Sequence, residues 1–385
     1  NRVCIGVRGR PSPAWYAGGP GVTQRPASAI VLSPLAPGVH VRVEASPVYD
    51  FLAALLAVHR HGRGLQFDCP DAWVRAARRA LGAPSLRDLA AFAGGRALFV
   101  SLVALLERQA SDAGVAGFLR QLETVAPDEL LLVLLTSSRA ARPAREHLRA
   151  ALASRGAARE RALRRFAEAF PEELGRRQAL RLARADPGTT RDRLVRLLRR
   201  FYEAVYAQEE ARVWEYVRRD ADAKRRRLGE LPAEAFVEEA TGGMVPDPSV
   251  VAEAVVAPSW HVRPYTLVAD HVGSRTYVVP VGGGPGDESP EEHVVRVARA
   301  LADPSRLRIL RLLARRELYA QQVAEALGTS HVTALHHLAT LRAARLVRVV
   351  ERRNVRYYQL RPQALEEAAR ALVQLRRRGG TESGG

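Results

Sequence analysis

A single stretch, residues 302–360, constrains the fold of this 385-residue chain more than any other. It begins with Asp303 as a helix N-cap and Pro304 at the first helical position, where the missing N–H removes no hydrogen bond. Apolar residues then recur at helical spacing. Two further helices are expected, a short one that ends at Gly328 and a longer one that starts at Ser330. Two helices joined by a tight turn that contains glycine are typical of a helix-turn-helix.

The residues after the third helix predict a β-hairpin. Residues 346–350 are apolar and largely β-branched, residues 351–354 are polar, and residues 355–360 favour a returning strand. A hairpin directly after a recognition helix is a wing, and arginines at its tip would lie beside the DNA backbone. We expect phosphate contacts from Arg352, Arg353 and Arg356. Arginines that are merely solvated are the alternative interpretation.

The pattern of residues 298–360 resembles the winged-helix domain of the ArsR-type transcriptional repressors. The matching motifs are ALADPSRLRIL at 300–310, the helix start from Ser330 to Leu338, LRAARLV at 341–347 and the Tyr358-x-Leu360 ending. The resemblance implies a homodimer that binds double-stranded operator DNA. It also implies that the apolar stripes within 294–301 and 365–375 form the dimer interface; packing of both stripes inside one subunit is the alternative.

Several residues depart from that family's pattern. Many members bind metal or arsenite through two cysteines one residue apart, and Tyr319 and Gln321 stand at those positions. After the wing, the chain offers only Glu366 and Glu367, which as neighbours lie on different helix faces. We therefore expect no metal site of the family's usual kind, and no other cofactor. Arg345 stands where relatives usually carry glycine.

The helix that starts at Ser330 is the predicted recognition helix. Because its N-terminal end enters the major groove in this fold, His331 and Thr333 are the expected readers of base edges. Neighbouring side chains on a helix point about 100° apart, so we expect His336 to face DNA while His337 supports the fold or a phosphate. The predicted DNA-binding set comprises Ser330, His331, Thr333, Ala334, His336, His337, Arg342, Arg352, Arg353 and Arg356.

The distribution of charge agrees with a DNA-binding region at this end of the sequence. The chain carries a formal charge of +18, nearly all of it from arginine, since Lys224 is the only lysine. A GC-rich genome would favour arginine codons in any case, so the total alone says little. Residues 291–378, however, hold eighteen arginines against eight acidic residues. That local surplus favours a surface for nucleic acid.

The whole chain is predicted to be mainly α-helical with small β elements. Residues 1–38 are rich in Pro and Gly and are expected to be a disordered or weakly ordered tail. Residues 39–281 predict a larger helical N-terminal domain with a small sheet, which we interpret as a sensor or assembly domain. A linker at 282–288, the winged-helix domain at 289–378 and a disordered tail at 379–385 complete the chain.

Two features of the N-terminal domain are specific enough to test. Apolar residues at helical spacing predict one long helix that begins after residues 189–192 and runs to about residue 228. Its basic run at 224–227 could contact DNA, or it is a solvated helix end that complements the helix dipole. The β-rich segments between 250 and 281 suggest a small meander that could pair with a strand at 40–44.

The sequence shows no catalytic motif. It contains no phosphate-binding glycine loop, nucleophile elbow, HExxH or CxxC pattern. Cys4 and Cys69 are too few for a disulfide framework, and no apolar run approaches the ~18 residues of a membrane span. We expect a cytoplasmic, sequence-specific transcriptional regulator of the repressor type, not an enzyme, that responds to a small-molecule effector. An enzyme with a DNA-targeting module and a non-specific nucleic-acid-binding protein are the alternatives.

Overall fold

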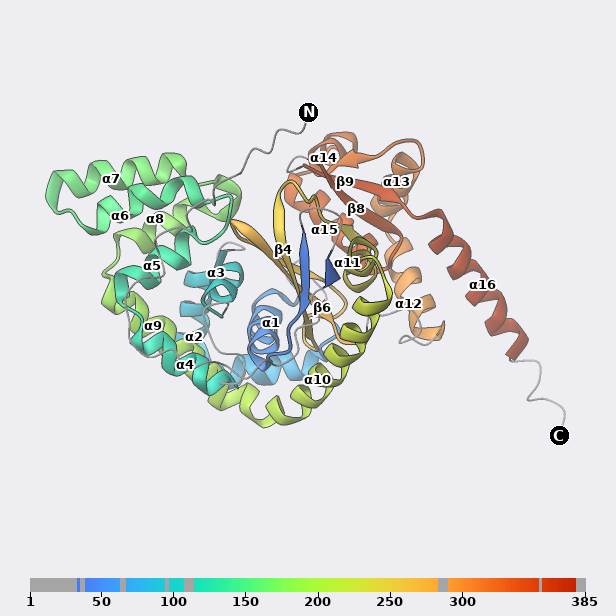
Figure 1. Cartoon of the computed structure of the whole chain (residues 1–385), viewed down its shortest axis with the longest axis horizontal. Coiled ribbons are helices and arrows are strands. Elements are labelled where there is room, and N and C mark those ends of the chain that lie inside the picture. The colour runs from blue at the N-terminus through green and yellow to red at the C-terminus, as the bar shows by residue number, and fades with distance from the viewer. Residues whose placement is uncertain are drawn as a thin grey trace, which may run out of the picture. The chain divides into compact units, whose positions relative to one another are not determined.

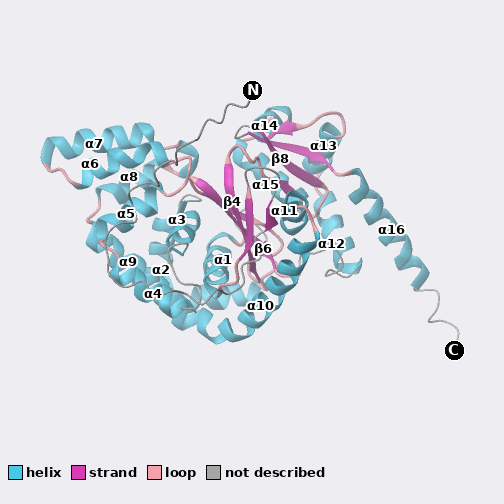
Figure 2. Cartoon of the chain, viewed as in Figure 1, coloured by secondary structure: helices cyan, strands magenta, loops and turns pink. Residues whose placement is uncertain are grey.

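The computed structural model of the chain describes residues 33–34, 39–62, 67–93, 97–106, 114–282, 290–352 and 355–378. The described residues all belong to one compact unit. The predicted class, mainly α with small β elements, is confirmed (Figure 2). Most of the predicted tail at 1–38, the tail at 379–385 and residues 283–288 of the linker lie outside the described residues.

A five-stranded sheet forms the centre of the N-terminal part, in the order β1-β2-β4-β6-β5. Its strands are β1 (Ser33–Pro34), β2 (His40–Val43), β4 (Val251–Ser259), β5 (Leu267–Asp270) and β6 (Gly273–Pro280). The predicted pairing of the strand at 40–44 is confirmed, because β2 lies parallel to β4. The predicted meander is wrong. β4 and β6 are parallel neighbours, and β5 pairs antiparallel with β6 at the outer edge.

The long apolar runs of β4 and β6 explain why the meander was wrong. Both strands are buried along nearly their whole length, and parallel strands covered on both faces carry such runs. On one face, Ala257 and Val278 join a core built with helices such as α1 (Pro47–Arg60). On the other, Val256 and Val279 join a second core that includes α11 (Ala233–Thr241). Figure 1 shows β4 and β6 between α1 and α11.

Helices make up most of the described N-terminal part, and several of them pack against this sheet. The helices are α1 (Pro47–Arg60), α2 (Asp71–Ala93), α3 (Ala97–Leu106), α4 (Gly114–Thr124), α5 (Pro127–Thr136), α6 (Arg145–Leu152), α7 (Gly156–Ala169), α8 (Arg176–Arg184), α9 (Pro187–Phe201), α10 (Ala207–Glu230) and α11 (Ala233–Thr241). Short 3-10 turns occur at η2 (Arg142–Ala144) and η3 (Glu172–Leu174). The predicted long helix corresponds to α9 and α10, which a π-helical turn, η4 (Tyr202–Tyr206), joins.

The winged helix-turn-helix follows the pattern expected from the sequence. Its elements are α12 (Pro290–Leu301), α13 (Pro304–Leu313), β7 (Leu318–Tyr319), α14 (Ala320–Leu327), α15 (His331–Ala343), β8 (Val347–Arg352), β9 (Val355–Leu360) and α16 (Pro362–Arg378). Asp303 caps α13 as predicted, since its side chain accepts the Arg306 N–H at 3.0 Å. Gly328 ends α14 in the left-handed conformation, with φ of 68°. The hairpin β8–β9 is the predicted wing.

One strand of the wing sheet comes from outside the winged helix. The four-stranded sheet has the order β3-β8-β9-β7, and β3 (Met244–Val245) follows α11 directly. β3 lies parallel to β8, with Met244 beside Val349. Gly243 allows this approach, because a Cβ there would lie 3.2 Å from the Arg348 Cα. The second core likewise unites Phe236 and Tyr277 with residues of α13 and α15. Packing therefore crosses the predicted boundary at 282–288.

Candidate nucleic-acid interface

The first turn of α15 is open to solvent. Ser330, His331, Val332 and Thr333 are all exposed, and Val332 is 71% exposed. Ser330 caps the helix, because its Oγ accepts the Thr333 N–H at 3.1 Å and lies 2.8 Å from the Thr333 Oγ1. The end of the helix that would enter a groove is therefore both capped and accessible.

The opposite face of α15 is part of the second core. Ala334, Leu338 and Leu341 are completely buried. Ala334, which the sequence placed in the DNA-binding set, packs among other apolar side chains because it occupies the inward position of the first turns. Its side chain cannot reach a duplex in this arrangement, so we leave Ala334 out of the interface.

The two adjacent histidines of α15 are both partly buried, so the expected division between an outward and an inward ring is not visible. His336 has a buried Nδ1 without a hydrogen-bond partner among the described residues. Burial lowers the pKa of His336, and the neighbouring His337 and Arg306 lower it further. His337 lies toward α13, with its Nδ1 4.0 Å from the Asp303 Oδ1.

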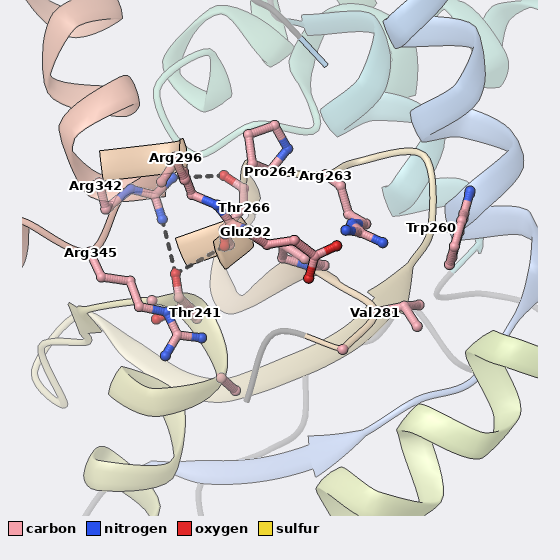
Figure 3. Close-up of a pocket in the computed structure, with 15 residues that line it drawn as sticks. Thr241, Trp260, Arg263, Pro264, Thr266, Val281, Glu292, Arg296, Arg342 and Arg345 are labelled. Carbon is pink, nitrogen blue, oxygen red and sulfur yellow. Dashed lines mark hydrogen bonds between the residues drawn. The ribbon is translucent and has the colours of Figure 1, made fainter. Parts of the chain in front are cut away.

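The C-terminal end of α15 is attached to the N-terminal part of the chain. Arg342 donates hydrogen bonds to the Thr241 carbonyl at 3.1 Å and to the Thr266 carbonyl at 3.0 Å (Figure 3). Burial lowers the pKa of this guanidinium. Arg342 was predicted to contact DNA, but its described partners are backbone carbonyls at the end of α11 and in the loop before β5.

The described wing arginines lie beside acidic side chains and are also partly exposed to solvent. Arg352 pairs with Glu317 and lies over the Tyr357 ring, with its guanidinium carbon 5.6 Å from the ring centroid. Its side chain nevertheless remains 53% exposed. Arg356 is 37% exposed and lies 3.5 Å from the Asp270 carboxylate. Arg353 lies outside the described residues. Arg352 and Arg356 can therefore still contact a duplex, because the exposed ion pairs that they would give up contribute little to stability.

A buried ion network that no sequence pattern indicated attaches the wing to the central sheet. Arg275 on β6 is only 1% exposed and pairs with Glu351 on β8 and with Asp270 on β5. Its guanidinium donates to the Glu351 Oε1 at 3.0 Å and to the Asp270 Oδ2 at 2.9 Å. Arg139 adds a further contact to the Asp270 Oδ1 at 2.5 Å. These partners lie on different elements, so no sequence spacing could indicate them.

A second buried polar cluster lies in the N-terminal part, around Asp50. Its carboxylate accepts hydrogen bonds from Ser259 Oγ at 2.7 Å and Tyr206 Oη at 3.0 Å, and it lies 2.7 Å from His261 Nδ1. Glu209 lies 3.5 Å from the other ring nitrogen of His261. Burial lowers the pKa of His261, but Asp50 and Glu209 outweigh it and raise the pKa to about 9. These groups contact one another through hydrogen bonds and ion pairs. The cluster therefore links α1, the π-helical turn and the loop after β4.

The described part of the chain contains neither a metal-binding cluster nor a membrane-spanning helix. No three His, Cys, Asp or Glu side chains gather closely enough to hold a metal ion among the described residues. None of the described helices combines the length and apolarity that a membrane crossing requires.

Comparison with known proteins supports the identity of the helix-turn-helix. The family model described as bacterial regulatory protein, arsR family, matches residues 303–349. The HTH-type transcriptional regulator KmtR of Mycobacterium tuberculosis is 39% identical over 77 residues, which cover 19% of this chain and 59% of KmtR. No solved structure matches the chain. The matched residues coincide with α13, α14, α15 and the start of the wing, so the C-terminal part of this chain contains an ArsR-type helix-turn-helix domain.

Proposed function

We propose that this chain is a DNA-binding transcriptional regulator that binds operator DNA through its ArsR-type winged helix. The proposal rests on which parts of α15 are exposed and which are buried. Its capped first turn is exposed while the opposite face is fixed in the core. A recognition helix needs both properties, because its base-reading side chains must be accessible and rigidly placed.

Within this interface, two groups of residues have different tasks. His331 and Thr333 on the first turn read base edges, and Ser330 holds that turn in place. Arg352, Arg353 and Arg356 contact phosphates, which adds affinity without sequence information. Arg342 supports the helix from behind through its two carbonyl contacts.

A homodimer would place two such helices on a two-fold symmetric site. Helices α12 and α16 pack against each other, and Val297 and Ala300 of α12 reach the second core. The outer sides of the two helices keep apolar side chains in solvent, with Val295 48% and Val373 50% exposed. We propose that a second copy covers these side chains, and that the dimer acts as a repressor.

The N-terminal part is proposed to sense an effector. β3 and Arg342 connect it directly to the wing sheet and to α15, so a ligand bound there would have a physical route to the recognition helix. Such a ligand would act by favouring one of two placements of the helix, which changes operator affinity.

Selection of bound sites from random duplex DNA with the purified full chain tests the proposal. We expect enrichment of a two-fold symmetric motif, bound roughly 10³-fold or more tightly than random duplex at physiological salt. Equal affinity for selected and random duplexes would instead identify a non-specific nucleic-acid-binding protein.

A further inference from the structure

A pocket of about 250 Å³ lies where the recognition helix meets the N-terminal part of the chain. Its walls come from the end of α11, the loop after β4, the start of α12 and the C-terminal end of α15. In Figure 3, Arg342 and Arg345 lie on one side of the pocket, with Arg263 and Trp260 on the other. The pocket thus touches both the proposed sensor and the proposed reader of DNA.

The lining of this pocket is strongly cationic. Four arginines contribute to it: Arg263, Arg296, Arg342 and Arg345. Among the described residues that line the pocket, Glu292 is the one acidic side chain. Arg342 is bound by two carbonyl dipoles, and carbonyls do not neutralise its charge. Arg263 lies over the Trp260 ring at 5.1 Å and only 3.8 Å from Asp68, a long ion pair.

The backbone at Arg345 is an independent sign of function. Arg345 has φ of 57° and is the only described non-glycine residue with positive φ. An L-residue other than Asn or Asp is disfavoured in this left-handed conformation, whereas glycine adopts it easily. A left-handed residue commonly ends a helix, and it is usually glycine. Here an arginine takes that place and carries its guanidinium into the pocket despite the backbone strain.

We propose that this pocket binds a small anion bearing phosphate or carboxylate groups, and that this anion is the effector. The effector role rests on the proposed function. Guanidinium forks match both anions through paired N–H donors. The pocket has room for a compact anion but not for a large cofactor.

The route from the pocket to DNA is short. An anion bound here competes with the Thr241 and Thr266 carbonyls for the Arg342 guanidinium. Arg342 belongs to α15, so any change in these bonds changes how the recognition helix is attached. The ligand thereby favours one placement of α15, and the effect on DNA equals its difference in affinity for the two placements.

Isothermal titration calorimetry on the full chain tests the pocket without DNA. The probes are inorganic pyrophosphate and citrate, with sodium chloride at matched ionic strength as the blank. We expect one of the two anions to bind, and the comparison assigns the site to phosphate or to carboxylate chemistry. Absence of binding by both anions, or binding that chloride abolishes, overturns the proposal.

Arg345→Gly is the decisive variant, because glycine relieves the backbone and removes the guanidinium. We expect anion affinity to fall at least tenfold while the melting temperature stays equal or rises. Arg164→Gln on α7 removes an exposed arginine far from the pocket and is the matched control for net charge. Unchanged anion affinity in Arg345→Gly, or an equal loss in Arg164→Gln, overturns the site.

The effector role is tested separately. The affinity of the wild-type chain for its selected duplex is measured with and without the anion. We expect the anion to change this affinity at least tenfold, and Arg345→Gly should abolish the change. An anion that binds but leaves DNA affinity unchanged overturns the effector role alone.

A chain that binds the anion but no duplex overturns the proposed function, while the assignment of the pocket as an anion site still holds. Loss of DNA binding by Arg345→Gly without any anion would overturn the effector role as well, because the arginine would then hold the DNA backbone instead.

Discussion

The two ends of α15 are built in opposite ways. Its N-terminal turn is exposed and is capped by Ser330. Its C-terminal end is fixed by Arg342 to carbonyls of another part of the chain, beside a wing that Arg275 attaches to the central sheet. This winged helix is therefore packed against the rest of the chain: the N-terminal end of α15 is open to solvent, and its C-terminal end belongs to the same packed unit as the proposed sensor.

Replacement of Arg275 by Met gives the largest expected effect on the supporting end. It leaves the buried Glu351, which is 5% exposed, without its main partner. An uncompensated buried charge costs about 3–5 kcal/mol. Urea unfolding measures the decrease in stability. Arg348→Met, also on β8, serves as the control. It removes a 3.7 Å ion pair with Glu238 and a 2.7 Å hydrogen bond to Gln359, but the Arg348 side chain is 43% exposed, so the change should cost below about 1 kcal/mol.

The wing arginines should show the reverse pattern. Changing Arg352, Arg353 and Arg356 together to alanine should leave unfolding nearly unchanged but weaken binding to every duplex by roughly 10- to 100-fold. The dependence of affinity on salt should flatten by about one unit for each phosphate that an arginine no longer neutralises. Fluorescence anisotropy at several salt concentrations measures both quantities. Weaker binding confined to the selected sequence would contradict the assignment of these arginines to phosphate.

His331→Ala and Thr333→Ala should change which sequences are bound. Removal of a base-edge hydrogen bond costs about 1–3 kcal/mol at one position of the site and relaxes the preference there. Repeated site selection with each variant measures the change. If these variants weaken all duplexes alike, as the wing variants should, then the two groups do not have separate tasks.

A change of pH should affect the stability of the fold rather than the recognition of DNA. The folded pKa of His261, about 9, lies above its ordinary value of 6.5. The ion pairs of the charged ring therefore stabilise the fold fully below about pH 6.5, and this contribution disappears as the pH rises toward about 9. We expect a decline of roughly 3 kcal/mol in the free energy of unfolding across that window, since each pKa unit corresponds to about 1.4 kcal/mol. His261→Gln should flatten this part of the stability curve, and an unchanged curve would contradict the pairing.

The smallest expected effect belongs to the cap. Ser330→Ala removes the acceptor of the Thr333 N–H and should cost about 1 kcal/mol of stability. Because Ser330 holds the exposed turn, affinity for the selected duplex should fall more than affinity for random duplex. Ser330→Asn keeps a capping oxygen and should restore stability. Circular dichroism melts and anisotropy measure the two effects.

Features set by local chemistry could be predicted from the sequence. The caps at Asp303 and Ser330, the left-handed Gly328 and the hairpin after α15 all depend on residues within a few positions of one another, and all are present in the structure. The parallel pair β4 and β6 was misassigned because apolar runs do not specify a strand's neighbour. The contacts of Arg342 and Arg275 join elements far apart in the chain, and only the folded arrangement reveals that Arg342 donates to the Thr241 and Thr266 carbonyls.

The short strand β3 has a further consequence for the wing sheet. By lying beside β8, it occupies the backbone donors and acceptors that would otherwise form a bare sheet edge. A fragment cut before residue 289 would lack that covering strand and would also present part of the shared apolar core to water. Such a fragment would be prone to join with other copies edge to edge, so the winged helix of this chain depends on its larger neighbour for its solubility as well as its placement.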